Sequence, residues 1–134
     1  MKPAWKLSLT LLLGLALSGG PSANAQDSSN TLQSLDYAFF AGGKLAVRMI
    51  FKHELAEPPG TFTTYYPSIR TVLDFVNMHS AVSTQPIEVH ERDLWTLQVV
   101  QSGARTRVII QLLRPMIREM EATGKELMLT LTPP

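Results

Sequence analysis

The sequence predicts an all-β protein, a small sandwich of two roughly four-stranded sheets. Hydrophobic and polar residues alternate over several stretches of five to nine residues, which is the period of a strand with one buried face. Turns rich in glycine or proline separate these stretches, and after residue 25 no segment shows the period of an amphipathic helix. Because each sheet would have one apolar face, we expect two sheets to pack face to face.

The first 25 residues are predicted to be a cleaved secretory signal peptide. Lys2 and Lys6 give a positive start, and residues 7–17 form an apolar run. Residues 19–21, Gly-Gly-Pro, then interrupt any helix, and residues 23–25, Ala-Asn-Ala, have the small residues of a cleavage site. The alternative is a membrane anchor, but the apolar run is well short of the roughly 20 residues that span a bilayer.

Removing residues 1–25 from a chain of 134 leaves 109 residues, enough for one domain with one core. Of 12 basic residues, Lys2 and Lys6 are then lost, so 10 remain against 11 acidic ones and the net charge is near −1. This balance argues against nucleic-acid binding, which needs a concentrated basic surface. The chain has no cysteine, so packing must stabilise it without disulfides.

The first half of the domain is predicted to contain four strands. A polar lead-in at 26–30 precedes them, and Leu35 and Tyr37 of the first strand should point inward. The strands are expected at 31–37, 44–52, 62–66 and 69–75, with turns at 41–43 and 57–60. In the second strand the inward positions are Leu45, Val47, Met49 and Phe51.

The second half follows a connecting loop at 76–92, in which residues 87–89 are a candidate short strand. Strands are expected at 93–101, 105–113, 116–122 and 125–132, and Pro133-Pro134 as the start of a linker or the chain end. The strand from residue 105 should turn Thr106, Val108, Ile110 and Leu112 inward and Arg105, Arg107, Ile109 and Gln111 outward. Pro115 should end its ladder, and Leu127, Leu129 and Leu131 should face the core.

The two halves also resemble each other, which predicts an internal duplication. Residues 32–37 match 94–99, strand 44–52 matches 105–113, and strand 69–75 matches 125–131. The alternative is chance, because all-β chains often contain similar patterns.

Taken together, these residues resemble the AMIN domain family, and most closely the AMIN domain at the N-terminus of type IV pilus secretins. The similarity covers about residues 30–132. It is carried by Gly42-Gly43-Lys44, Pro58-Pro59-Gly60, Arg70 with Leu73-Asp74-Phe75, Glu91 with Asp93-Leu94, residues 101–108 (Gln-Ser-Gly-Ala-Arg-Thr-Arg-Val) and Leu127 to Leu131. The chain departs from the family at Val76-Asn77, where a proline is common, and at Arg92, where a glycine is common.

The resemblance implies a periplasmic, non-catalytic module that binds peptidoglycan and positions a pilus or secretion complex in the cell envelope. It also implies secretin or pilus-assembly proteins as possible partners. The alternative is a protein-interaction subunit that docks on a secretin or envelope partner through a sheet edge or the aromatic strand 62–66, without binding the cell wall. After removal of the signal peptide, no transmembrane segment is expected.

The candidate binding residues are Arg105, Arg107, Arg70 and Arg48, all at outward strand positions, with Gly103 shaping the turn before them. Guanidinium groups have planar forks that suit carboxylates, and peptidoglycan stem peptides carry several carboxylates. The alternative is a solvated face whose arginines pair with Asp74, Glu119 or Glu121, each pair contributing less than about 1 kcal/mol.

Catalysis and metal binding have weak support. His53, His79 and His90 lack zinc-site spacing, no nucleophile-elbow motif occurs, and no cofactor is predicted. Family amidases carry a separate zinc hydrolase domain for which 109 residues leave no room. Tyr65 and Tyr66 could stack on sugars, but packing in the core or at an edge is the preferred interpretation.

The first prediction concerns export. Signal peptidase should cleave before Gln26, because Ala23 and Ala25 supply the small residues that it requires. Mass spectrometry of the exported protein should therefore show an N-terminus at Gln26, and an intact Met1 in the mature pool would contradict this.

Overall fold

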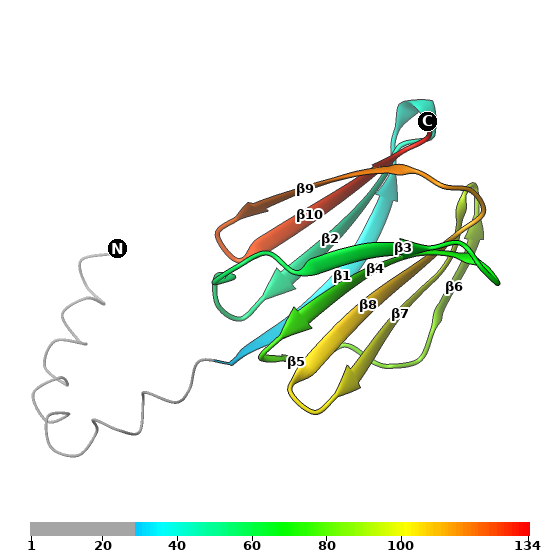
Figure 1. Cartoon of the computed structure of the whole chain (residues 1–134). Helices are drawn as coiled ribbons and strands as arrows, with labels where there is room; N and C mark the ends of the chain where they lie inside the picture. Colours follow the sequence, from blue (N-terminus) through cyan, green and yellow to red (C-terminus); the bar gives the residue numbers. More distant parts are fainter. Residues whose placement is uncertain (1–28) are drawn as a thin grey trace, which may run out of the picture.

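In the computed structural model, which describes residues 29–134, two five-stranded sheets pack face to face (Figure 1). The predicted all-β sandwich is confirmed, and residues 1–25, the predicted signal peptide, lie outside the described residues. The elements are β1 (Asn30–Phe39), the 3-10 turn η1 (Ala41–Gly43), β2 (Leu45–Phe51), β3 (Gly60–Thr64), β4 (Ile69–Val76), β5 (Met78–Ser80), β6 (Ile87–Glu91), β7 (Leu94–Ser102), β8 (Arg105–Leu112), β9 (Ile117–Thr123) and β10 (Glu126–Thr132).

One sheet, here called the β1 sheet, has the order β5-β1-β2-β10-β9. The other, the β8 sheet, has the order β3-β4-β8-β7-β6. All strand pairs are antiparallel except β1 with β5. No helix in residues 29–134 is long and apolar enough to cross a membrane.

The core lies between the two sheets and consists of the alternating side chains that the sequence predicts. In β2, β8 and β10 every second residue is buried, and the intervening residues are half-buried or exposed apart from Ala46. The fully buried positions include Val47 and Phe51 of β2, Ile110 of β8 and Leu129 of β10. Burial of such side chains contributes roughly 1.5–3 kcal/mol each, which makes this interface the main source of stability.

The strand order agrees with an internal duplication in which the two halves exchange strands. If β1, β2, β3 and β4 correspond to β7, β8, β9 and β10, the order β1-β2-β10-β9 in one sheet becomes β7-β8-β4-β3 in the other. Each half therefore places its first two strands in one sheet and its last two in the other.

The pairing register repeats as well. Leu35 pairs with Met49 in the first half, and the corresponding residues Leu97 and Ile110 pair in the second. Both β1 and β7 carry an irregularity at the same place, between Leu32 and Ser34 and between Leu94 and Thr96. A register and a bulge that both repeat are hard to attribute to chance, because each is set independently by turn and packing geometry.

Three expectations need correction. The connection at 76–92 contains the short strand considered at 87–89, which is β6, but also an unexpected strand, β5, and these two strands extend each sheet from four strands to five. Tyr37 shares a face with the buried Val47 but is 36% exposed. Tyr65 and Tyr66 follow the end of β3 and are 64% and 90% exposed, so their expected packing in the core or at an edge is wrong.

The second prediction concerns the core. Leu129→Ala should lower the free energy of unfolding by about 2–5 kcal/mol, because a fully buried side chain leaves a cavity between the sheets. Thr130→Ala, on the outer face of the same strand, should cost less than about 1 kcal/mol. Urea titrations of both variants give the comparison, and a loss below about 0.5 kcal/mol for Leu129→Ala would contradict the assigned inner face.

Candidate functional site

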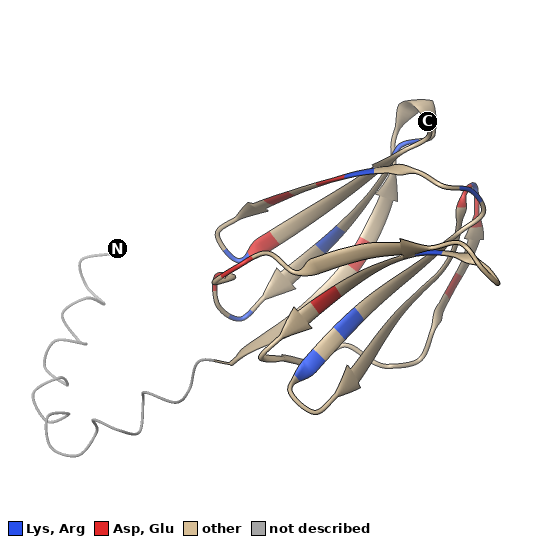
Figure 2. Ribbon diagram, in the orientation of Figure 1, with Lys and Arg blue, Asp and Glu red and all other residues tan. Residues whose placement is uncertain are grey.

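Two arginines and an aspartate meet on the outer face of the β8 sheet. Arg105 and Arg107 alternate along β8 with the buried Thr106 and Val108, so both point away from the core. On the neighbouring strand β4, Asp74 pairs directly with Arg107 in the register. Figure 2 shows the two basic positions of β8 beside the acidic position of β4.

Asp74 interacts with the two arginines unequally. Its Oδ2 accepts a hydrogen bond from Arg105 Nη2 at 2.6 Å. Arg107 Nε lies 3.7 Å from Asp74 Oδ1, which is an ion-pair contact but too long for a hydrogen bond. Asp74 Oδ1 is buried and has no hydrogen-bond partner among the described residues. The guanidinium of Arg107 therefore keeps donors that a ligand can use.

The electrostatics follow from this geometry. The hydrogen bond from Arg105 lowers the pKa of Asp74, and the charges of Arg105 and Arg107 act in the same direction, while burial opposes them. The same hydrogen bond raises the pKa of Arg105. The Asp74 side chain is 15% exposed, whereas those of Arg105 and Arg107 are 57% and 48% exposed. One carboxylate is thus held ionised beneath two accessible cations.

An apolar strip adjoins the arginines. The carbon Cζ of Arg107 lies 5.7 Å from the ring centroid of Phe62 on β3, within the range of a cation–π interaction. Phe62 is partly exposed and pairs with Val72, which in turn pairs with Ile109 of β8. The register therefore places these three apolar side chains in one row across the sheet. We call this surface, with Asp74, Arg105, Arg107 and Arg70, the arginine face.

The turn that the sequence predicts at Gly103 is present. Gly103 lies in the turn between β7 and β8 with a φ of +61°, a conformation that side-chain-bearing residues rarely adopt. This turn brings Ser102 opposite Arg105, which is the last pair of the β7–β8 ladder. Gly103 therefore fixes where the arginine-bearing strand begins.

The four predicted arginines do not form one site. Arg70 lies on β4 opposite Gln111, on the same outer face as Arg105 and Arg107, and forms no ion pair within residues 29–134. Arg48 lies on β2, in the other sheet, where Asp36 holds it at 3.1 Å and raises its pKa. Of the ion pairs given above as the alternative to ligand binding, the pairing with Asp74 is present, and it involves Arg105 and Arg107.

Glu119 and Glu121, the other acidic partners considered, lie on β9 at the edge of the β1 sheet. They are therefore not part of the arginine face.

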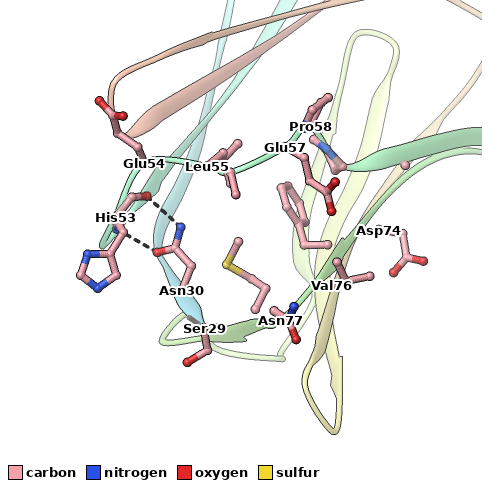
Figure 3. A pocket seen from close by; sticks show the side chains of 15 residues that line it. Ser29, Asn30, His53, Glu54, Leu55, Glu57, Pro58, Asp74, Val76 and Asn77 are labelled. Carbon is pink, nitrogen blue, oxygen red and sulfur yellow. Dashed lines mark hydrogen bonds between the residues drawn. The ribbon is translucent and has the colours of Figure 1, made fainter. Parts of the chain in front are cut away.

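A groove of about 580 Å³ opens beside Asp74, where the connection between β2 and β3 passes from one sheet to the other (Figure 3). Its lining includes the buried Phe75 and Met78 together with Glu54 and Glu57, and Figure 3 shows the Glu57 carboxylate directed toward the groove while that of Glu54 points away. It contains no lysine or arginine. This groove therefore suits an amino group better than a carboxylate, in contrast to the arginine face next to it.

Asn30 holds the loop that forms this groove. Its Nδ2 donates to the carbonyl of His53, and its Oδ1 accepts from the amide of His53, both at 2.8 Å (Figure 3). Asn30 is almost fully buried, and a buried amide without hydrogen-bond partners would destabilise the fold. These two bonds supply the partners.

Sequence reasoning missed an aromatic pair at the β6–β7 hairpin. The rings of His90 and Trp95 stack at a centroid distance of 3.8 Å and an interplanar angle of 12°. His90 Nε2 also lies 2.6 Å from Glu88 Oε1. Both His90 and Arg92 have positive φ angles, the region that favours glycine. No periodic signal marks this contact, because it depends on the local turn.

The three histidines lie in different surroundings, and within residues 29–134 no group of three or more His, Asp or Glu side chains could hold a metal ion. No protein-family model, curated protein or solved structure matches this chain. The resemblance to the AMIN domain therefore stays a prediction.

The third prediction concerns the Asp74 ion pairs. Because folding lowers the pKa of Asp74, its ionised form stabilises the protein above the ordinary carboxyl range, about pH 4, and this contribution is lost as the pH falls through the lowered value. The difference in unfolding free energy between the parent and Asp74→Asn should be constant near neutral pH and shrink in acid. Denaturant titrations across this range provide the measurement, and a difference independent of pH would contradict it.

Proposed function

We propose that this protein is a non-catalytic, periplasmic peptidoglycan-binding module, and that the arginine face is its binding surface. One observation supports this most directly. Two half-exposed guanidinium groups share a single carboxylate, and one of them contacts it only at 3.7 Å. The face therefore has unused hydrogen-bond donors and an excess of positive charge.

A carboxylate ligand matches these donors. Arg105, Arg107 and Asp74 together carry a net charge of +1, and Arg70 on the same face adds another. Asp74 orients Arg105, so the entropy cost of ordering that guanidinium has largely been met before a ligand arrives. A stem-peptide carboxylate can then accept a charge-assisted bond from Arg107, whose planar fork allows two parallel bonds.

The apolar strip suits the rest of such a ligand. Peptidoglycan combines carboxylates with sugar rings and alanine methyl groups. The exposed ring of Phe62 and the half-buried Ile109, on either side of the buried Val72, offer an apolar surface for these parts. Lactyl or alanyl groups can thus pack beside the arginines while the carboxylates face the guanidinium groups.

In this proposal the signal peptide directs the chain to the periplasm, where wall binding would hold a pilus or secretin complex in place. The rival function is a protein-interaction subunit that docks on a secretin or another envelope partner without direct wall binding. The two proposals differ in one measurable property, the binding of isolated sacculi.

The fourth prediction tests the arginine face. Arg105→Gln with Arg107→Gln should weaken cosedimentation with purified sacculi by at least about tenfold, since each charge-assisted bond contributes about 1.5–3 kcal/mol. Lysine at both positions should restore only part of the binding, because an ammonium group lacks the planar fork. Binding by the parent should fall as salt rises.

A matched control is available in this chain. Arg48 and Arg114 are also exposed, and each pairs with an aspartate, at 3.1 Å and 3.0 Å, but neither lies on the arginine face. Arg48→Gln with Arg114→Gln removes the same charge and should bind sacculi within about twofold of the parent, a difference below about 0.5 kcal/mol. Full sedimentation of the folded Arg105 and Arg107 variant, or equal losses in both double variants, would reject the proposed site.

A further inference from the structure

The upper part of β1 forms an open edge of the β1 sheet. β5 pairs with β1 only from Asn30 to Leu32, and the last contact is a bond from the Ala81 amide to the Leu32 carbonyl at 2.9 Å. From Ser34 to Phe39, within residues 29–134, β1 has a strand on its β2 side only. Figure 1 accordingly shows β5 beside the lower end of β1 alone.

The backbone groups that face this open edge can be identified. The Phe40 amide donates to the Lys44 carbonyl at 2.8 Å, so this pair is a hydrogen-bonded pair of the β1–β2 ladder. Such pairs alternate along an antiparallel ladder. In the register of β1 with β2, the amides of Leu35, Tyr37 and Phe39 therefore point away from β2 and toward the edge.

The side chains of the same three residues form an incompletely covered apolar row. Leu35, Tyr37 and Phe39 pair with the buried Met49, Val47 and Leu45, so they lie on the inner face of the sheet. Leu35 and Phe39 are only partly buried, and Tyr37 is 36% exposed. An added strand would bring every second side chain onto this row, because side chains alternate between the two faces.

The other edges of the sandwich are less suited to strand addition. The β9 edge turns Arg118 inward, where it donates to Thr63 at 2.7 Å, and an inward charge disfavours a further strand. The β3 edge has Thr61 and Thr63 on its inner face instead of apolar residues. The β6 edge has an irregular register and a positive φ at His90. The β6 edge does have two apolar inner residues, Ile87 and Val89, but its ladder is broken between Glu88 and Glu91. Within residues 29–134, the β1 edge therefore joins an unbroken register from Ser34 to Phe39 to an apolar inner row.

A positive charge at one end of this edge, that of Arg92, would favour an added strand with an acidic residue there. Arg92 lies with its Cζ 5.2 Å from the ring centroid of Phe39, is exposed, and forms no ion pair within residues 29–134. Midway along the edge Asp36 is already paired with Arg48. A strand that passes Phe39 would therefore gain from an acidic residue at that end.

We propose that the β1 edge from Ser34 to Phe39 binds an extended segment of a partner protein by strand addition. The segment carries apolar side chains at alternating positions and an acidic residue where it passes Arg92. This surface is separate from the arginine face, which lies on the outer side of the other sheet, so the inference does not depend on wall binding.

The fifth prediction tests this edge with a defined probe. The purified protein should select, from a phage-displayed library of random twelve-residue peptides, sequences with apolar residues at every second position and Asp or Glu at one end. A selected peptide is then synthesised with a fluorophore and its Kd is measured by anisotropy. On binding, hydrogen exchange should slow at the amides of Leu35, Tyr37 and Phe39.

Two variants of Tyr37 distinguish the contribution of its backbone N–H to peptide binding from that of its side chain. Tyr37→Pro removes an N–H that points away from β2, so no hydrogen bond to β2 is lost. An edge strand tolerates proline at such a position. Tyr37→Ala removes the same ring and keeps the N–H. The proline variant should bind the peptide at least about tenfold more weakly than the alanine variant, as expected for a lost backbone bond with its flanking contacts. Circular dichroism must first show that both variants are folded.

A charge cycle provides an independent check. Arg92→Gln should weaken binding of the acidic peptide and leave binding of the same peptide with Gln in place of the acidic residue unchanged. The proposal is overturned if the library enriches no alternating peptide, if the three amides stay unprotected, or if the Pro and Ala variants bind equally. A dimer in analytical ultracentrifugation that Tyr37→Pro dissociates would also overturn it, since a second copy would then occupy the edge.

Discussion

The pairing of the two halves of the chain across both sheets is the constraint on which the rest of the structure depends. β2 pairs with β10 and β4 pairs with β8, so each sheet is completed by strands from the other half. Neither half can bury its apolar faces alone, because its strands belong to two different layers. The buried Val47 and Leu129, which pair directly, show how closely the two halves share one core.

This pairing also creates the candidate site. Asp74 belongs to the first half and Arg105 and Arg107 to the second, and they meet only because β4 and β8 are neighbours in a fixed register. A shift of one residue would turn Asp74 into the core and Thr71 outward. The buried alternation of both strands prevents such a shift, so hydrophobic packing determines the electrostatics of the outer face.

The sequence predicted the strands with one buried face well, because burial imposes a period of two. It placed Arg105 and Arg107 on one face for the same reason. It could not assign Arg48 to the other sheet, since alternation shows that a residue points outward but not from which layer.

β5 was missed because three residues cannot display a period, and its position depends on a bond between residues far apart in sequence, from Thr106 Oγ1 to the Met78 carbonyl at 2.7 Å. Tyr65 and Tyr66 were misplaced because aromatic composition does not show where a strand ends.

The exchange of strands between the halves also governs the order in which the chain can fold. During synthesis the first half emerges before the second, and β2 has no partner on one side until β10 exists. Contacts between residues near 47 and 129 close long loops, and such topologies fold slowly. The chain consequently remains incompletely folded until its last strand has been made. For the proposed export route, this delay would keep the polypeptide unfolded, as a translocation channel requires.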